Sequence, residues 1–117
     1  MSSVLDLLAA LVRGRSVAEG EGELARRCAE VLEDAGLKPT LVPWRGVDGR
    51  LASGREQLVA RSGDGATPLT LTGHLDTVPA DAASWTSDPW SAERDGDRVL
   101  GRGTSDMKSG VAALVTA

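Results

Sequence analysis

The chain has 117 residues, which is enough for one ordinary domain and no more. Its net charge is −4 and its 13 basic residues are scattered, so neither nucleic acid nor an anionic membrane is an expected partner. The single cysteine excludes an internal disulfide, and no apolar run is long enough for a transmembrane helix. Because the first residues also lack a secretion signal, we expect a cytoplasmic protein.

Two amphipathic helices are predicted in the first third of the chain. Ser3 and Asp6 form a capping-box pattern, and the apolar residues that follow predict a helix that ends near Gly14. A second helix is predicted from about residue 21 to residue 35, with Gly36 as its stop signal. Cys28 lies on the apolar side of this helix and is expected to be a buried small residue.

Strands are predicted in the middle of the chain. Residues 39–44 and 57–61 have strand patterns, and a polar, glycine-containing loop separates them over residues 45–55. The apolar and small residues at 69–73 predict a buried central strand. Residues 95–97 resemble a hairpin turn before a short strand.

The predicted central strand leads directly into the only histidine, His74, and into Asp76. Side chains alternate along an extended segment, so these two residues, two positions apart, point the same way. A metal-bound imidazole needs an acceptor at its other ring nitrogen, and Asp76 is the candidate. Further on, Gly101 and Gly103 frame a flexible turn, and Asp106 lies where a helix over residues 107–117 is predicted to begin.

Three separated blocks of this sequence resemble a known enzyme family in their order and spacing. They are Gly73-His74-Leu75-Asp76-Thr77-Val78-Pro79, Trp85-Thr86-Ser87-Asp88-Pro89-Trp90 and Gly101-Arg102-Gly103-Thr104-Ser105-Asp106-Met107-Lys108-Ser109-Gly110. The family is the dinuclear zinc hydrolases of the acetylornithine deacetylase, succinyl-diaminopimelate desuccinylase, aminoacylase and carboxypeptidase G group. The resemblance is strong over the second half of the chain and loose over the first.

The resemblance implies a fold and a set of site residues. The fold is α/β, a three-layer zinc-exopeptidase-like catalytic domain with a mixed sheet flanked by helices. His74 is implied to bind one metal. Asp76 is implied to be a catalytic residue that orients the ring of His74, and Asp106 to bridge two metals. It also implies a cis peptide bond after Asp106.

The implied reaction is the hydrolysis of an amide bond, N-acyl or peptide, in a small amino-acid derivative such as an N-acyl amino acid or a dipeptide. The implied cofactor is a pair of Zn²⁺ ions, with Co²⁺ or Mn²⁺ as alternatives. Two such ions lower the pKa of a bridging water and polarise the carbonyl. Complete members of the family are often homodimers.

Part of the family's site is missing from these residues. The family has a later acidic pair, another acidic ligand, a second histidine and a dimerisation or lid domain, none of which this sequence contains. The apolar pattern of the last predicted helix also stops without a cap. We therefore expect residues 1–117 to be the N-terminal part of the catalytic domain, which alone binds metal weakly and turns over no substrate.

Other interpretations remain open from the sequence. The chain could be a carboxypeptidase or an aminoacylase of the same group, or a truncated remnant without catalytic activity. His74 could be a structural residue, Asp76 could cap a turn, and Asp106 could be a plain N-cap. Lys108 is expected to be a solvated lysine in the first turn of the last helix. Trp85 and its neighbours at 89 and 90 are expected to pack a loop against the wall of the site.

Overall fold

The structure is a computed structural model that describes residues 3–17 and 20–117. Its helices are α1 (Val4–Arg13), α2 (Glu21–Asp34) and α3 (Ser109–Thr116), and its strands are β1 (Thr40–Arg45), β2 (Leu51–Val59), β3 (Glu93–Asp95) and β4 (Arg98–Leu100). A short 3-10 turn (Ala82–Ser84) and a π-helical turn (Thr104–Lys108) complete the regular elements. None of the helices in this described part is long and apolar enough to cross a membrane.

The first two helices form where the sequence predicts them. The Ser3 hydroxyl accepts a hydrogen bond from the amide of Asp6 at 3.2 Å, and the carboxylate of Asp6 accepts one from the amide of Ser3, so the capping box is confirmed. α1 is followed by Gly14 as its C-cap. α2 ends at Asp34, and Gly36 follows with a φ of 86°, a left-handed conformation that glycine adopts without strain.

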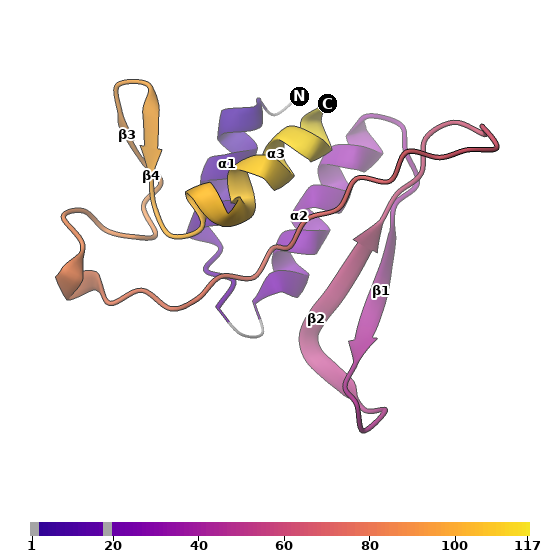
Figure 1. The fold of residues 1–117 in the computed structure, drawn as a ribbon, viewed down its shortest axis with the longest axis horizontal. Coiled ribbons are helices and arrows are strands. Elements are labelled where there is room, and N and C mark those ends of the chain that lie inside the picture. The colour runs from indigo at the N-terminus through magenta and orange to yellow at the C-terminus, as the bar shows by residue number, and fades with distance from the viewer. Residues whose placement is uncertain (1–2, 18–19) are drawn as a thin grey trace.

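The apolar core lies between the three helices. α1 and α3 pack against each other, and α2 lies beside them and contacts the β1–β2 hairpin (Figure 1). Apolar side chains at 3.6-residue spacing on α1 and α2 meet the buried start of α3. The buried cluster consists of Leu7, Leu8, Leu11, Val12, Leu24, Cys28, Ala92, Val111 and Ala112. The prediction that Cys28 is a buried apolar residue is confirmed.

The two sheets of the described residues are antiparallel hairpins, β1–β2 and β3–β4. β3 and β4 pair as expected around the turn at Gly96, whose φ is 61°. β2 differs from its prediction because it begins at Leu51, six residues before the expected start. Residues 51–56 include Gly54 and lack a regular apolar alternation, which is why the strand pattern is not visible there. Glu56 pairs with Pro43, and after a register shift Leu51 pairs with Arg45.

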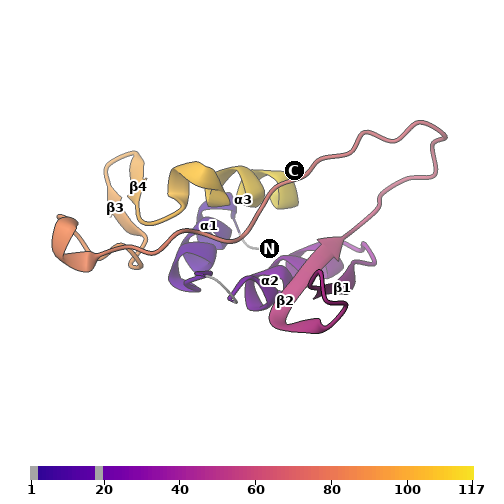
Figure 2. The same cartoon turned by 60° about the horizontal axis from the view of Figure 1, so that its bottom comes forward.

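The prediction of a buried central strand at residues 69–73 is wrong for the described residues. The segment is extended, but no strand pairs with it there, and Leu69 and Leu71 keep 85% and 60% of their surface exposed. It runs as a long, open stretch between α3 and β2 (Figure 2). Apolar composition favours a strand, but burial depends on neighbouring elements that pair with the strand and cover it.

Candidate metal centre

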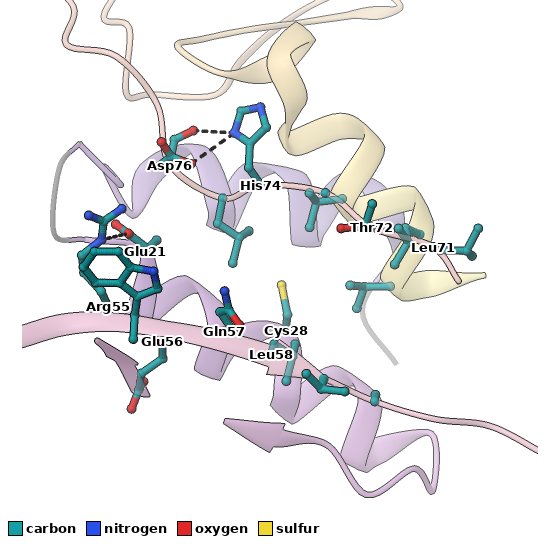
Figure 3. Close-up of a pocket in the computed structure, with 18 of the residues that line it drawn as sticks. Glu21, Cys28, Arg55, Glu56, Gln57, Leu58, Leu71, Thr72, His74 and Asp76 are labelled. Carbon is teal, nitrogen blue, oxygen red and sulfur yellow. Dashed lines mark hydrogen bonds and ion pairs between the residues drawn. The ribbon is translucent and has the colours of Figure 1, made fainter. Parts of the chain in front are cut away.

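The structure brings together the three residues that the sequence singles out. The ring nitrogen Nε2 of His74 lies 2.9 Å from Oδ1 of Asp106, and Nδ1 lies 3.3 Å from Oδ1 of Asp76. Nδ1–H also donates a hydrogen bond to the main-chain carbonyl of Asp76 at 3.0 Å. In Figure 3 the side chains of His74 and Asp76 lie together, on the side of their segment that faces away from β2. The prediction that they point the same way is confirmed.

Both ring nitrogens of His74 therefore face oxygen acceptors. A carbonyl can only accept, so Nδ1 carries a proton, and a hydrogen bond between Nε2 and the Asp106 carboxylate also needs a proton on one of these two atoms. The hydrogen bond to Asp106 accordingly raises the pKa of His74 above its ordinary value, with smaller contributions from Asp76. A metal ion that binds Nε2 would take the place of the proton on this nitrogen.

Asp106 reaches His74 from the π-helical turn that precedes α3. Asp106 and Met107 have non-helical backbone angles inside this turn, so α3 begins at Ser109 and not at the expected residue 107. The alternative that Asp106 is the N-cap of the last helix is wrong, because Lys108 precedes α3 and the Asp106 carboxylate contacts the imidazole. The peptide bond between Asp106 and Met107 is cis, as expected.

Lys108 is not the solvated lysine that the sequence predicts. Its side chain is fully buried, and Nζ donates a hydrogen bond to the carbonyl of Leu11 at 2.6 Å. Burial lowers the pKa of Lys108 to about 8. Position in a first helical turn suggested exposure, whereas the contact depends on α1, 97 residues earlier in the chain. Nothing in the local sequence around Lys108 could have indicated it.

The Gly-Arg-Gly turn at residues 101–103 brings the turn of Asp106 against the segment of His74. Gly103 has a φ of 82°, and a Cβ at this position would lie 2.4 Å from Cγ2 of Thr77. Only glycine therefore allows the two segments to approach this closely. Trp85 lies over the guanidinium of Arg102 at 5.1 Å, which agrees with the prediction that the tryptophan loop packs on the wall of the site.

A cavity of about 170 Å³ opens at the three residues, and Thr77, Val78, Arg102 and Gly103 complete its lining. The side chains of His74 and Asp106 are 46% and 87% exposed, so a ligand from solvent can reach both groups. A larger cavity of about 570 Å³ lies between β2, α3 and residues 70–76 (Figure 3).

The donor atoms fit a divalent metal in kind but are too few to hold one firmly. Imidazole nitrogen and carboxylate oxygen are ligands that zinc accepts, and the contact of Nδ1 with Asp76 would keep Nε2 free to bind. Over residues 3–17 and 20–117, however, no group of three or more histidine, cysteine, aspartate or glutamate side chains gathers into a metal site. His74 and Asp106 are therefore a pair of candidate ligands, and catalytic zinc sites use three protein ligands.

Sequence reasoning missed one residue that shapes the site. Ser16 is fully buried, and its hydroxyl donates a hydrogen bond to the carbonyl of Leu75, between His74 and Asp76. The amide of Thr77 donates to the carbonyl of Ser16 at 2.9 Å. A serine in a loop between two helices has no sequence signal that would indicate this contact.

Comparison with known proteins identifies relatives over most of the chain. Residues 70–117 match the model of peptidase family M20/M25/M40. The chain is 42% identical to succinyl-diaminopimelate desuccinylase 1 of Ruegeria sp. (strain TM1040) over 97% of its length, and 32% identical to acetylornithine deacetylase of Edwardsiella ictaluri (strain 93-146) over 98%. It covers 28% and 30% of those proteins.

A solved structure supports the fold. Human carnosine dipeptidase 1 superposes with a TM-score of 0.78 over 96% of this chain, at 22% sequence identity, and this chain covers 26% of it. The α/β class expected from the sequence is therefore confirmed. Of the curated relatives, the succinyl-diaminopimelate desuccinylase of Gluconobacter oxydans (strain 621H) is 38% identical, and the chain spans 27% of its length.

Proposed function

Because this chain is related to peptidase family M20/M25/M40, with residues 70–117 matching its model, we propose that it is part of a metal-dependent hydrolase. The reaction is the cleavage of an amide bond in a small acylated amino acid. The relatives named as desuccinylases and a deacetylase, 32–42% identical over nearly the whole chain, support this class of substrate. On this proposal residues 1–117 form the N-terminal part of the catalytic domain.

The observation that supports the proposal best is the arrangement of His74 between two aspartates. Nε2 of His74 and Oδ1 of Asp106 face each other at 2.9 Å on an open surface and would both bind the metal. Asp76 would hold the ring by its Nδ1–H, which fixes the tautomer and raises the basicity of Nε2. Asp106 has a second carboxylate oxygen, so it is the residue that could bridge two ions.

The metals, two Zn²⁺ in a complete site, would supply a water of lowered pKa and polarise the scissile carbonyl. The residues of this chain would hold and orient them. The remaining ligands, and a general base to move the proton from water to the leaving amine, would come from outside the described residues.

Zinc calorimetry on this chain tests the proposal. We expect weak binding that is lost in His74→Ala and in Asp106→Asn, because each variant removes one of the two donors. Amide hydrolysis, assayed in the same samples with an N-acyl amino acid, is expected to be undetectable. Asp48→Asn, in the loop between β1 and β2, is the matched control and should bind zinc like the original chain.

Two results would contradict parts of the proposal. Zinc binding that survives both His74→Ala and Asp106→Asn would show that the metal binds elsewhere, and the site assignment would fail. Tight, stoichiometric binding together with turnover would show that this chain completes a site by itself, so that the assignment of the remaining ligands to other residues would fail.

A further inference from the structure

Lys108 connects the turn that carries Asp106 to the end of α1. The last carbonyls of a helix have no intrahelical partner, and α1 ends at Arg13. The amide of Arg15 would reach the carbonyl of Leu11 if the helix continued, but it donates to Val12 at 3.4 Å. Nζ of Lys108 donates to the carbonyl of Leu11 instead, at 2.6 Å. The ammonium group therefore also lies at the negative end of the helix dipole.

Ser16 connects the segment that carries His74 to the loop after the same helix. Its hydroxyl donates to the carbonyl of Leu75, and its own carbonyl accepts from the amide of Thr77. Val17 and Thr77 form an isolated parallel bridge. These contacts hold the main chain on both sides of Asp76, so the residues at 74–76 cannot shift along their own axis without breaking them.

Both proposed metal donors are thus tied to one short stretch of chain, residues 11–17. We infer that this stretch is the frame that sets the distance between His74 and Asp106, and that Lys108 and Ser16 are its positioning residues. The inference rests on the proposed function, because it concerns the spacing of the proposed metal donors.

A purely structural role explains the lysine poorly. A buried ammonium loses its hydration, and an apolar side chain of similar length could fill the same space without that penalty. What an apolar side chain cannot do is bind the Leu11 carbonyl and so fix the position of the turn. The lysine stem also lies against Gly103, where an added Cβ would be 3.3 Å from Cδ of Lys108, so the turn has little room to adjust.

The test compares zinc affinity and thermal stability in Lys108→Met, Ser16→Ala and a control. Lys108→Met keeps the apolar stem and removes the charge, and Ser16→Ala removes one hydroxyl. The control is Leu7→Ala, a buried position nearer the other end of α1. We expect zinc affinity to fall at least tenfold in the two site variants, and to be unchanged in Leu7→Ala even though its melting temperature falls as much or more.

A second measurement needs no metal. His74 is the only histidine, so every ¹⁵N signal from an imidazole ring belongs to it. The Nε2 shift reports the contact with Asp106, and Asp106→Asn provides the reference for its loss. We expect the Nε2 shift of Lys108→Met and of Ser16→Ala to move toward that reference, and that of Leu7→Ala to stay with the original chain.

The outcomes separate the inference from the proposed function. If His74→Ala abolishes zinc binding while Lys108→Met and Ser16→Ala bind normally, the inference is overturned and the proposed function stands. If the original chain binds no zinc through His74, the proposed function fails. The Nε2 shift then still tests the inference, which is overturned if the shift is unchanged in Lys108→Met and Ser16→Ala. Should Lys108→Met not fold, Ser16→Ala decides by the same two measurements.

Discussion

His74 is held by an acceptor at each ring nitrogen, and this determines its charge. Asp106 faces Nε2, and the carbonyl and carboxylate of Asp76 face Nδ1. The charged ring is favoured, so the pKa of His74 lies above its ordinary value. A proton and a metal ion compete for Nε2, so zinc affinity should rise with pH through this raised pKa.

At the residue scale, NMR titration of His74 gives a direct prediction. We expect its pKa in the folded chain to exceed that in the urea-unfolded chain, and to fall in Asp106→Asn because the largest cause of the increase is removed. The stabilising contribution of this contact is present below the unfolded pKa and is lost as pH rises through the folded one. Asp48→Asn, with the same change of charge, should leave the pKa unaltered. Equal values in the folded and unfolded chains would contradict the geometry.

At the scale of elements, α2 holds the β1–β2 hairpin against the core. A Cβ on Gly22 would lie 2.4 Å from the carbonyl oxygen of Gly54, so helix and strand approach as closely as two backbones allow. Arg55 reaches back from β2 to Glu21, at the start of α2, with 2.5 Å between Nε and the carboxylate. Cys28, about two turns further along α2, is buried in the apolar core.

The buried thiol of Cys28 makes the stability of the chain depend on pH. Burial raises its pKa from 9.0 to about 11, so between these values the unfolded chain releases a proton that the folded chain keeps. Its contribution is complete below pH 9 and should decrease by about 2 to 3 kcal/mol on approaching pH 11. Urea unfolding of the original chain and of Cys28→Ala at both pH values measures this. The unfolding free energy of the original chain, relative to that of Cys28→Ala, should be lower at pH 11 than at pH 9 by that amount. If this difference is the same at both pH values, the thiol is not buried in solution.

At the scale of the whole molecule, the segment at residues 69–76 is the least supported part of the fold near the site. It passes between α3 and β2 (Figure 2). A cavity of about 570 Å³ lies beside it (Figure 3). Within residues 3–17 and 20–117 its amides donate to no acceptor, and its anchoring contacts to Ser16 begin only at Leu75. In the part of the chain that the structure describes, the main chain at His74 is thus anchored only on its C-terminal side, at Leu75 and Thr77.

Hydrogen exchange can compare the local stability of residues 69–76 with that of α2. We expect the amides of residues 69–76 to exchange at nearly the rate of an unfolded peptide, because they are not hydrogen-bonded within the described residues. The amides in the middle of α2, which are bonded and close to the core, should be protected by the free energy of global unfolding. Protection at 69–76 equal to that of α2 would show that the segment is paired in solution, for instance with a second copy.

The helices, the β3–β4 hairpin and the three residues of the candidate site are all predicted from local sequence patterns. Capping, 3.6-residue periodicity and turn chemistry act within a few residues, and the blocks around His74 and Asp106 are contiguous motifs. The start of β2 differs from its prediction because pairing with β1 extends the strand. The start of α3 differs because the π-helical turn delays the helix to Ser109.

How the site residues are held, and which residues are buried, follows from contacts between segments that are far apart in the sequence. Lys108 is buried against a segment 97 positions away, and Ser16 bonds to a residue 59 positions away. Residues 69–73 are exposed because no neighbouring strand among the described residues pairs with them. The physical reason is that burial and hydrogen-bond partnership belong to pairs of segments. A local pattern shows which side chains could be buried or bonded, and the packing of distant segments decides which of them are.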